Sequence, residues 1–588
     1  MSRYSRFLCA VLVTATMAVG VASQANAATS TTVRALALLH ARTPSGNFAS
    51  AVEVAGTAGL NAGGNDEVDN ISCSSPGNCG AGGFYTDSAG HQQVWVANEV
   101  KGSWTSAVEV PGMALLNAGT VSDFNEISCP SDGNCTAVGD YTDESGELQA
   151  FVVDEKGGTW GSAIEATGTG FLNADGVALA LTVSCSSAGN CTAGGDFANA
   201  SAQLQAFSIN EVNGVWDSAV QLPGIATLGT NSTFTWIKCS SVGNCSGVGV
   251  YTDASTHTQS FVDDEQNGTW ATAQETPGDV TLNAGGDMEF NEISCSSVGN
   301  CAAGGFYTDA ATHLQAFTIS ETGGVWSTAA ELPGIATLNA GGASAVFGVS
   351  CTASGSCAAV GNYTDSASHE QAFVADEVGG TWGSIQEAPG SAALNVAGAA
   401  NLNEVSCTSP GNCDGGGFYS DTASSSQALV IDEVDGTWGS AQEAPGTAAL
   451  NAQGNATVLT TSCSAYGDCT AGGFYLDSAG NSQAFAITET FTKAIEKIHV
   501  TVTQTTRVVK HVVSEVGLKI SASGLGTATG TVTFSAGAAK LCTATISGGV
   551  AKCSSSKHFK KGPISVTAKY AGNMFDQAAT ATSRVSVK

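Results

Sequence analysis

Seven carboxylates in this chain lie where they could do chemistry, a few residues before the cysteine that opens a repeated pair. They are Asp66, Asp69, Asp123, Glu126, Asp287, Glu289 and Glu292. Converging carboxylates bind cations and accept hydrogen bonds from polyhydroxyl ligands, and a pair separated by roughly 5 to 10 Å can hydrolyse a glycosidic bond. Solvated loop carboxylates explain the same pattern without a ligand. We predict a ligand-binding site at these residues and assign no catalytic residue.

Another acidic or amide residue opens a turn in each repeat. This set comprises Asp87, Asp143, Asn199, Asp253, Asp309, Asp365, Asp421 and Asp477. A side chain of this kind caps its own turn, which explains the set without a ligand. We expect no cofactor, with calcium alone left open, because calcium needs six to eight oxygens and one carboxylate per repeat does not supply them.

Other residue patterns argue against the common enzyme classes. Histidines occur four residues after the turn residue at His91, His257, His313 and His369. They belong to different repeats, so exposed loop histidines are favoured over a metal cluster. No G-x-S-x-G elbow, H-E-x-x-H helix or phosphate-binding loop occurs. Paired cysteines leave no thiol for nucleophilic chemistry.

The cysteines set the period of the chain. Of 19 cysteines, all but Cys9 fall into pairs, and eight pairs have the spacing C-x5-C and recur every 56 residues, with one interval of 54. These pairs are Cys73–Cys79, Cys129–Cys135, Cys185–Cys191, Cys239–Cys245, Cys295–Cys301, Cys351–Cys357, Cys407–Cys413 and Cys463–Cys469. Two thiols per repeat are too few for a four-ligand zinc site, so a disulfide within each repeat is expected.

Each repeat contains four extended segments separated by turn residues. In the fifth repeat they are 273–276, 292–295, 301–307 and 315–320. No window has the apolar spacing of a helix, so helix is expected to be nearly absent. Four short antiparallel strands, repeated eight times, predict an all-β fold in which residues 28–490 form an eight-bladed β-propeller.

The two ends of the repeat array predict that the propeller closes. A strand-like segment at 50–54 precedes the first cysteine pair, and the last repeat stops after its fourth segment, at 483–489. Pairing these two segments completes an eighth blade from both ends and leaves no open sheet edge. A β array that does not close is the alternative.

A turn near the end of each repeat carries a family resemblance. Asp154–Trp160, Asp376–Trp382 and Asp432–Trp438 resemble degenerate Asp-box turns of the BNR or sialidase-like propellers. The resemblance implies a structural role, on the face opposite the active site. It also implies a substrate-binding arginine cluster, but the body of the chain has only Arg34 and Arg42, which excludes a sialidase. Packing between blades is expected of Trp104, Trp160, Trp216, Trp270, Trp326, Trp382 and Trp438.

The turns sort into two faces if the second segment of each repeat is the innermost strand. The disulfide turns and the Asp-box-like turns then share one face, which repeats itself. The loops before the second segment share the other face, and these loops vary between repeats. They are acidic around Asp123 but apolar at 177–181 and 345–347. We therefore expect the ligand on the variable face.

The carboxy-terminal part differs from the repeats. Residues 491–503 are predicted to be a linker and 504–588 a β-sandwich. Gly530–Phe534 and Val566–Asn573 resemble the bacterial Ig-like repeat family, which implies a spacer or binding module. Cys542 and Cys553 are predicted to staple a hairpin. A basic patch at Lys557, Lys560 and Lys561 suits an anionic wall polymer, or equally the acidic propeller of the same chain.

The amino terminus and the charge distribution indicate an exported protein. Residues 1–27 have the basic start, apolar core and Ala25-Asn26-Ala27 site of a signal peptide, and an uncleaved anchor is the alternative. Residues 28–492 contain 5 basic and 48 acidic residues, whereas residues 493–588 contain 13 and 3. The acidic body repels nucleic acid and anionic membranes. The mature chain is expected to be extracellular, monomeric and not inserted in a membrane, with association with the cell wall left open.

These patterns favour a secreted or cell-surface, non-enzymatic binding or adhesion protein. Its expected partner is an extracellular glycan, a cell-wall polymer or a protein. The propeller is the expected recognition scaffold, and the Ig-like module is the expected spacer or wall-binding element. The alternative is a polysaccharide-active hydrolase or lyase with its site on the variable face.

Overall fold

The computed structural model describes residues 48–489, 499–509, 512–523, 531–547, 550–555, 557, 559, 562–571 and 579–587. The predicted leader at 1–27 lies outside the described residues, as do Lys560 and Lys561.

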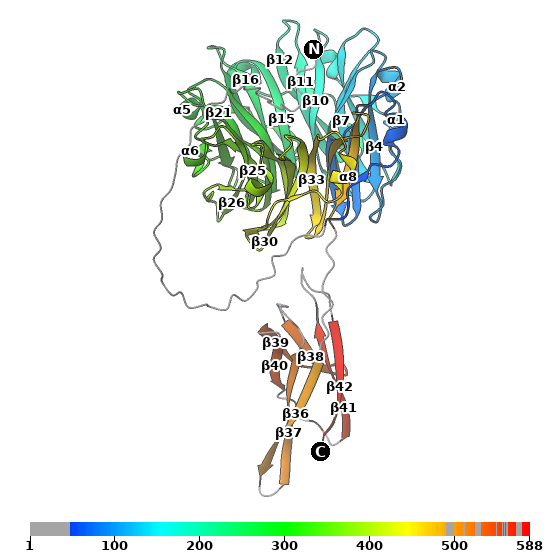
Figure 1. The fold of residues 1–588 in the computed structure, drawn as a ribbon, viewed down its shortest axis with the longest axis vertical. Helices are drawn as coiled ribbons and strands as arrows, with labels where there is room; N and C mark the ends of the chain where they lie inside the picture. Colours follow the sequence, from blue (N-terminus) through cyan, green and yellow to red (C-terminus); the bar gives the residue numbers. More distant parts are fainter. Residues whose placement is uncertain are drawn as a thin grey trace. The chain divides into compact units, whose positions relative to one another are not determined.

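Eight antiparallel sheets, here called blades 1 to 8, follow one another along residues 48–489 (Figure 1). Each blade begins with an innermost strand, and blades are numbered by these strands. The innermost strands are β2 (Asn70–Ser75), β6 (Ser122–Ser131), β10 (Ala178–Ser187), β15 (Thr230–Ser241), β20 (Met288–Ser297), β24 (Ser344–Ala353), β28 (Ala400–Ser409) and β33 (Ala456–Ala465). The second strands are β3 (Asn78–Thr86), β7 (Asn134–Thr142), β11 (Asn190–Ala198), β16 (Asn244–Thr252), β21 (Asn300–Thr308), β25 (Ser356–Thr364), β29 (Asn412–Ser420) and β34 (Asp468–Leu476).

Two further strands complete each blade. The third strands are β4 (Gln92–Glu99), β8 (Leu148–Asp154), β12 (Leu204–Val212), β17 (Thr258–Gln266), β22 (Leu314–Ser320), β26 (Glu370–Val378), β30 (Ser426–Val434) and β35 (Ser482–Thr488). The outer strands are β5 (Val108–Glu109), β9 (Ile164–Glu165), β14 (Val220–Gln221), β19 (Gln274–Glu275), β23 (Ala330–Glu331), β27 (Gln386–Glu387), β32 (Gln442–Glu443) and β1 (Val52–Glu53). Short strands β13 (Val215–Trp216), β18 (Thr269–Trp270) and β31 (Thr437–Trp438) add to three blades.

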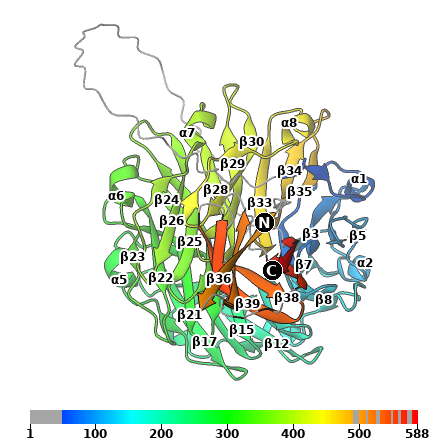
Figure 2. The same ribbon diagram turned by 90° about the horizontal axis from the view of Figure 1, so that it is seen from below.

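The ring of blades closes as predicted, and the alternative of a non-closed array is wrong. Strand β1 pairs with β35, with Val52 opposite Ala486, so both ends of the array build blade 8. The innermost strands of blades 8 and 1 also meet, because the Cys73 amide donates to Ser462 Oγ at 2.9 Å. Figure 2 shows the blades arranged around a common centre.

The same serine hydrogen bond occurs at seven of the eight blade junctions. The hydroxyl of the serine just before the first cysteine of one blade accepts a hydrogen bond from the backbone amide of the first cysteine in the next blade. The serines are Ser72, Ser128, Ser184, Ser294, Ser350, Ser406 and Ser462. In blade 4 this position is Lys238, so the junction that follows lacks the contact.

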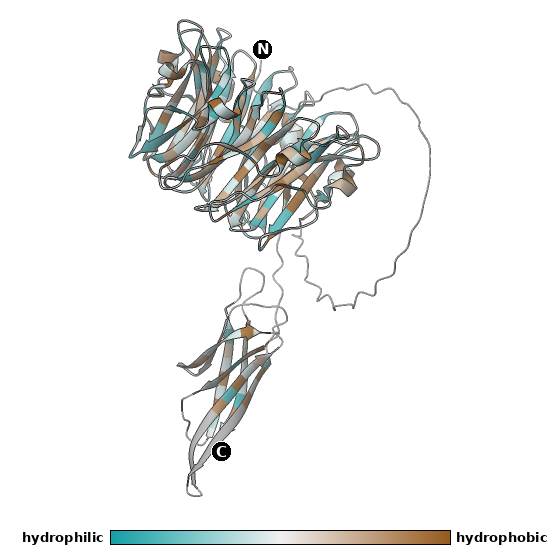
Figure 3. Cartoon of the chain, turned by 90° about the vertical axis from the view of Figure 1, so that its left-hand side faces the viewer, coloured by the Kyte–Doolittle hydropathy of each residue, from teal (hydrophilic) through white to brown (hydrophobic). Residues whose placement is uncertain are grey.

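The structural blade is offset from the sequence repeat. Strand β19, the first segment of the fifth repeat, pairs with β17 and therefore belongs to blade 4. The eight predicted disulfides each join the innermost and second strands of one blade. Figure 3 shows hydrophobic residues along the blade strands, and these side chains pack between neighbouring blades.

A one-turn helix follows the outer strand in each repeat, although the sequence predicted that helix would be nearly absent. The helices are α1 (Thr57–Leu60), α2 (Met113–Leu116), α3 (Thr169–Leu172), α4 (Ile225–Leu228), α5 (Asp279–Leu282), α6 (Ile335–Leu338), α7 (Ser391–Leu394) and α8 (Thr447–Leu450). Each begins after a glycine with positive φ, such as Gly278 at 93°. Four residues are too few to show a helical period, which is why the sequence did not reveal them.

The two predicted faces are confirmed. The Gly102 amide in the Asp-box-like turn of blade 1 donates to Gly77 in its disulfide turn at 2.9 Å, so these turns lie together. On the other face, the Gly63 amide donates to Thr86 at 2.8 Å, which places the loop after α1 beside the next turn.

A buried glutamate lies at the end of the third strand in each blade, at a blade junction, and in seven blades it begins the Asp-box-like turn. These residues are Glu99, Glu155, Glu211, Glu265, Glu321, Glu377 and Glu433, with Glu489 at the equivalent position of blade 8. At some junctions the preceding blade supplies a neutral donor, as where Ser320 Oγ donates to Glu377 at 2.9 Å. At others it supplies a second acid, as where the charge of Asp376 acts on Glu433.

The carboxy-terminal part is a separate all-β module. Its strands are β36 (His499–Val509), β37 (Val512–Ser523), β38 (Thr531–Ala536), β39 (Ala539–Ser547), β40 (Val550–Ser555), β41 (Gly562–Tyr570) and β42 (Ala579–Val587). They pair in the order β36-β37-β40-β39-β38-β41-β42. The module has its own core around Phe534 and Tyr570, and Cys542 is bonded to Cys553 as predicted. Strand β36 begins inside the range predicted to be a linker, and the Ig-like family assignment stays a prediction.

Candidate functional site

The seven carboxylates predicted to bind a ligand occupy or adjoin three innermost strands, β2, β6 and β20. Asp66, Glu126 and Glu292 are buried, whereas the other four are half-buried: Asp69, Asp123, Asp287 and Glu289. The structure distributes them among different local networks instead of bringing all seven to one point.

Asp66 is engaged in closing the propeller. Its carboxylate accepts hydrogen bonds from Trp95 Nε1 at 2.9 Å and from the Ala484 amide at 3.3 Å, and the side chain is fully buried. Burial raises the pKa of Asp66 to about 7 despite these hydrogen bonds. Because Ala484 belongs to blade 8, this carboxylate joins blades 1 and 8.

Glu126 and Glu292 converge on a lysine from a third blade. Lys238 Nζ in blade 4 lies 2.8 Å from Glu126 Oε1 and 4.0 Å from Glu292 Oε1. The second oxygen of Glu126 accepts hydrogen bonds from Thr182 Oγ1 at 2.7 Å and from the Val183 amide at 2.9 Å. The structure therefore ties blades 2, 3, 4 and 5 together through these side chains.

Electrostatics keeps Lys238 charged in this position. Burial by itself lowers the pKa of Lys238, but the surrounding glutamates, Glu126 foremost, outweigh burial and raise it. Lys238 Nζ also lies 5.8 Å from the centre of the Trp236 ring, within the range of a cation–π contact. Sequence reasoning missed Lys238, although it is the one basic residue at a position that is serine in seven repeats.

Asp123 belongs to a second network, which we call the acidic sector: Asp123, Asn125, Asp140, Asp196 and Thr233. Asp123 on β6 lies directly opposite Asp140 on β7. Asn125 Nδ2 donates to Asp140 Oδ1 at 3.2 Å and reaches blade 3 through the Ala180 carbonyl oxygen at 2.9 Å. Asp196 in blade 3 accepts a hydrogen bond from Thr233 Oγ1 of blade 4 at 2.8 Å. The acidic sector thus spans three consecutive blades.

The three carboxyls of the acidic sector have raised pKa values. Burial is the main cause for Asp140, and the charges of Asp123 and Asp196 add to it, so its pKa lies well above the usual range. Burial also raises the pKa of Asp123, and that of Asp196 to about 7. Among the described residues none of the three forms an ion pair, so no base balances their charge.

Asp140 and Asp196 were not predicted from the sequence, although a signal for them exists. Both replace an aromatic residue that four other repeats keep before a tyrosine in the second strand. Those four residues are Phe84, Phe306, Phe418 and Phe474. The remaining two repeats have Val250 and Asn362 there. A carboxylate at a position that is phenylalanine in half of the repeats departs from the packing pattern, so it points to a local function.

Asp287 and Glu289 form a smaller acidic pair in blade 5. Burial raises the pKa of Asp287, and burial with the nearby charge of Asp287 raises that of Glu289 to about 7. Both side chains are half-buried on the variable face, where partly desolvated carboxylates are good acceptors for hydroxyl donors.

The turn aspartates and histidines are local structures. Asp309 Oδ1 accepts hydrogen bonds from the Ala311 amide at 2.7 Å and the His313 amide at 2.9 Å. Burial acts to raise the pKa of Asp309, but the backbone hydrogen bonds outweigh it and lower the pKa. His313 Nδ1 lies 3.6 Å from Asp309 Oδ2, and its side chain is 53% exposed. These distances describe a capped turn with an exposed histidine.

Metal-binding geometry is limited in the described part of the chain. There, the one group of three potential ligands within 4.8 Å of one another is Asp414, Cys463 and Cys469. The two sulfurs are bonded to each other, so they are poor metal ligands. The calcium option raised from the sequence stays a prediction.

The carboxy-terminal module carries a basic hollow of about 320 Å³. Its lining residues are Thr501, Lys519, Ile520, Ser521, Lys552, Cys553 and Ser554. Lys519 and Lys552 are both exposed, which places two cations beside serine hydroxyls. Of the predicted basic patch, Lys557 is exposed and the other two lysines lie outside the described residues.

By sequence, neither a known protein family nor a curated protein matches this chain. Among solved structures, a Dyadobacter fermentans protein of unknown function is similar at 10% identity and a TM-score of 0.34, covering 76% of this chain and 99% of that one. A subtype N11 neuraminidase-like protein (H18N11) is 12% identical with a TM-score of 0.31, and the match covers 62% of this chain and 86% of that one. A six-bladed Aleuria aurantia lectin is 10% identical with a TM-score of 0.27, and the match covers 55% of this chain and 96% of that one. TM-scores this low carry no argument about function, and the propeller assignment rests on the strand pairing above.

Proposed function

We propose that this chain is a secreted or cell-surface, non-enzymatic binding protein whose propeller recognises an extracellular glycan through its variable face. The carboxy-terminal module serves as a spacer or wall-binding element. The observation that carries the proposal is the acidic sector, where Asp123 is half-buried opposite the buried Asp140 and no base balances these carboxyls. Such groups gain most from a ligand that supplies hydrogen-bond donors or positive charge.

Export is supported by the disulfides, which persist outside the cytosol. Within the described residues, no helix has the length and apolar character needed to cross a membrane. The acidic body and the basic hollow of the module suit different partners, because the first repels anionic polymers and the second attracts them.

Binding is favoured over catalysis because the acids are engaged. A glycoside hydrolase needs two carboxyls that flank a substrate bond. Asp140 and Asp196 are buried, and Glu126 is neutralised by Lys238. Asp123 favours the enzymatic alternative, because it is half-buried with a raised pKa and could donate a proton as a general acid.

The proposal is tested with the full secreted chain on a glycan array and on purified cell-wall polysaccharides at increasing salt. We expect salt-resistant capture of a neutral glycan that weakens at least tenfold in Asp123→Asn. Glu144→Gln is the matched control, because Glu144 is an exposed carboxylate in the same blade. Absence of glycan capture by the wild type contradicts the proposal. Release of new reducing ends, lost in Asp123→Asn, supports the polysaccharide-active enzyme instead.

A further inference from the structure

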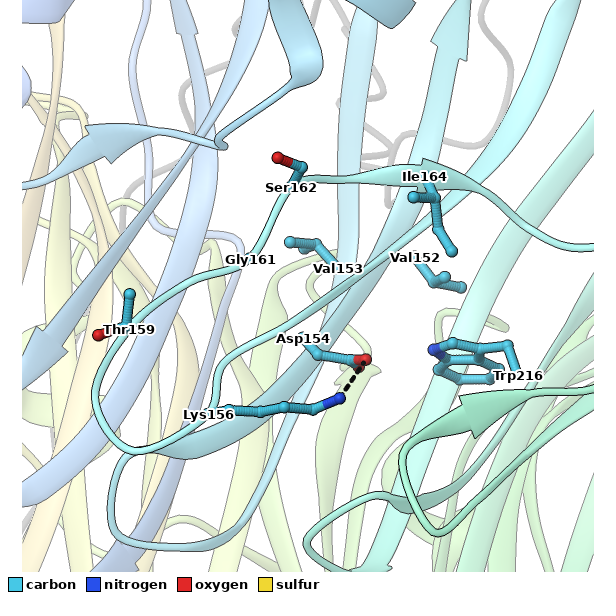
Figure 4. A pocket seen from close by; sticks show the side chains of 9 residues that line it. All are labelled: Val152, Val153, Asp154, Lys156, Thr159, Gly161, Ser162, Ile164 and Trp216. Atoms are coloured by element: carbon cyan, nitrogen blue, oxygen red, sulfur yellow. Dashed lines mark ion pairs between the residues drawn. The ribbon is translucent and has the colours of Figure 1, made fainter.

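A hollow of about 170 Å³ opens between blades 2 and 3, on the side of the Asp-box-like turns (Figure 4). It is distinct from the acidic sector, which lies on the variable face. Its walls come from the end of β8, from the turn and segment that follow, and from the next blade. The lining residues are Val152, Val153, Asp154, Lys156, Thr159, Gly161, Ser162, Ile164 and Trp216.

Lys156 distinguishes this junction from the others. The residue after the buried glutamate is uncharged in the other described turns, where it is Val100, Val212, Gln266, Thr322, Val378 or Val434. Lys156 Nζ lies 3.6 Å from Asp154 Oδ2 and 4.0 Å from Glu211 Oε1. Figure 4 shows the lysine reaching across the hollow toward Asp154.

Asp154 makes different contacts from its counterparts at three other junctions. At three other junctions the tryptophan of the next blade donates its Nε1 proton to the residue in this position, as Trp438 donates to Asp376 at 3.2 Å. Here Asp154 accepts from Thr136 Oγ1 at 2.9 Å and pairs with Lys156. Trp216 Nε1 donates no hydrogen bond among the described residues, a property it shares with Trp104 and Trp270.

The lining has the chemistry of a sugar site. The half-buried Trp216 ring and the exposed Ile164 side chain offer apolar surface to the C–H groups of a sugar ring. Asp154 offers acceptors, Lys156 offers donors, and hydroxyls lie at the exposed rim. The Lys156 side chain is 60% exposed, so a ligand can reach it from solvent.

The volume of the hollow and the charges around it restrict the class of ligand that it can bind. The hollow has room for about five or six waters at roughly 30 Å³ each, and it is smaller than the roughly 300 Å³ at which drug-sized sites begin. It therefore suits one sugar unit. The charge of Lys156 is balanced by Asp154 and Glu211, and the surrounding chain is strongly acidic, so a sugar acid is disfavoured.

We propose that the hollow between blades 2 and 3 binds one neutral sugar unit, packed against Trp216 and hydrogen bonded to Asp154 and Lys156. The inference deepens the proposed function and rests on it, because it adds a second recognition site and names its ligand class. A glycan held at both the variable face and this hollow would gain affinity from two attachment points.

The test uses the full chain and saturation-transfer NMR with methyl glycosides of glucose, galactose, mannose and N-acetylglucosamine. Methyl glucuronide is the charged comparison. We expect millimolar binding of at least one neutral glycoside, weakened at least tenfold in Lys156→Val. Valine is tolerated at this position in four repeats, so the variant is expected to fold. Thr322→Val, the same position in blade 5, is the control that leaves binding unchanged.

Trp216→Phe is a second variant, matched by Trp382→Phe at a junction where the tryptophan is hydrogen bonded to Ser320. We expect only Trp216→Phe to weaken binding. The inference is overturned if no neutral glycoside binds, if Lys156→Val binds like the wild type, or if the glucuronide binds as tightly as the neutral sugars. If the chain still captures glycans on the array but binds no methyl glycoside, this inference is wrong and the proposed function is retained. Monosaccharide binding without array capture at the variable face keeps this site and overturns the larger proposal.

Discussion

Lys238 offers the sharpest test of how the propeller centre is stabilised. Changing Lys238→Met keeps much of the aliphatic side chain but removes the charge that balances Glu126 and Glu292. The Glu126 side chain is 4% exposed, so its charge has little access to water. We expect the variant to be destabilised at neutral pH and much less so in acid.

The magnitude follows from the geometry. Removing one partner of a fully buried ion pair destabilises proteins by about 3–5 kcal/mol. Lys238 is 31% exposed, and Glu126 keeps its hydrogen bonds from Thr182 and Val183, so we expect a loss of about 2–3 kcal/mol at pH 7.5. The loss should be smaller in acid, because protonation of the carboxylates around this position removes the charge that the lysine balances.

The assay is urea unfolding followed by tryptophan fluorescence at pH 7.5 and pH 4.5. Lys101→Met is the control, because Lys101 is exposed and is expected to change the unfolding free energy little. Lys238→Ser restores the residue of the other seven repeats, whose hydroxyl accepts the next cysteine amide, so it should recover about 1 kcal/mol relative to methionine. A Lys238→Met loss below about 0.5 kcal/mol at both pH values would refute the reasoning, since that is the range of neutral surface changes.

Three further predictions address the blades. Burial raises the pKa of Glu433 to about 8 and the pKa values of Glu321 and Glu489 to about 7. Their contribution to the free energy of unfolding is therefore complete below about pH 4.3, the pKa of an unfolded glutamate, and is lost as the pH rises through 7 to 8. The urea midpoint should fall from pH 5 to pH 8, less steeply in Glu433→Gln, and a flat profile contradicts this. Gly305→Ala should cost about 3 kcal/mol, because its Cβ would lie 1.9 Å from the Glu289 carbonyl oxygen, whereas Gly59→Ala, with open space around it, is the control. Replacing Cys351 and Cys357 by serine should cost about 2 kcal/mol by urea unfolding, and an unchanged midpoint argues against that contribution.

Much of the propeller was predictable because every repeat obeys the same local rules. The disulfides were predictable because each repeat has one C-x5-C pair, which supplies too few thiols for a zinc site, in a chain with the features of an exported protein. The segment around Val52 precedes the first complete repeat, and the last repeat ends after the strand that contains Ala486. Pairing these two strands leaves no open sheet edge, which made closure predictable. The helices after residues such as Gly278 were missed because one turn is too short to leave a period.

The candidate site was only partly predictable. The acidic residues before the innermost strands were visible as a composition, but the sequence could not show which of them share a site. Asp66 turned out to join blades 1 and 8, and Glu126 turned out to bind a lysine 112 residues away. Asp140 and Asp196 could have been noticed in the sequence, because they are carboxylates where four other repeats have phenylalanine. The sequence does not show which residues lie next to them.

The sequence by itself determined the repeat number, the disulfide pairs, the closing strand and the acidic character of the propeller, because each depends on residue type and spacing within one or two repeats. Only the tertiary structure decided which charges meet. Lys238 reaches Glu126 and Glu292 from another blade, and Lys156 of blade 2 lines a hollow together with Trp216 of blade 3. The physical reason is ring closure. Wrapping eight sheets around one centre brings together side chains from different repeats, and their electrostatic energies depend on distance and burial, not on separation along the chain.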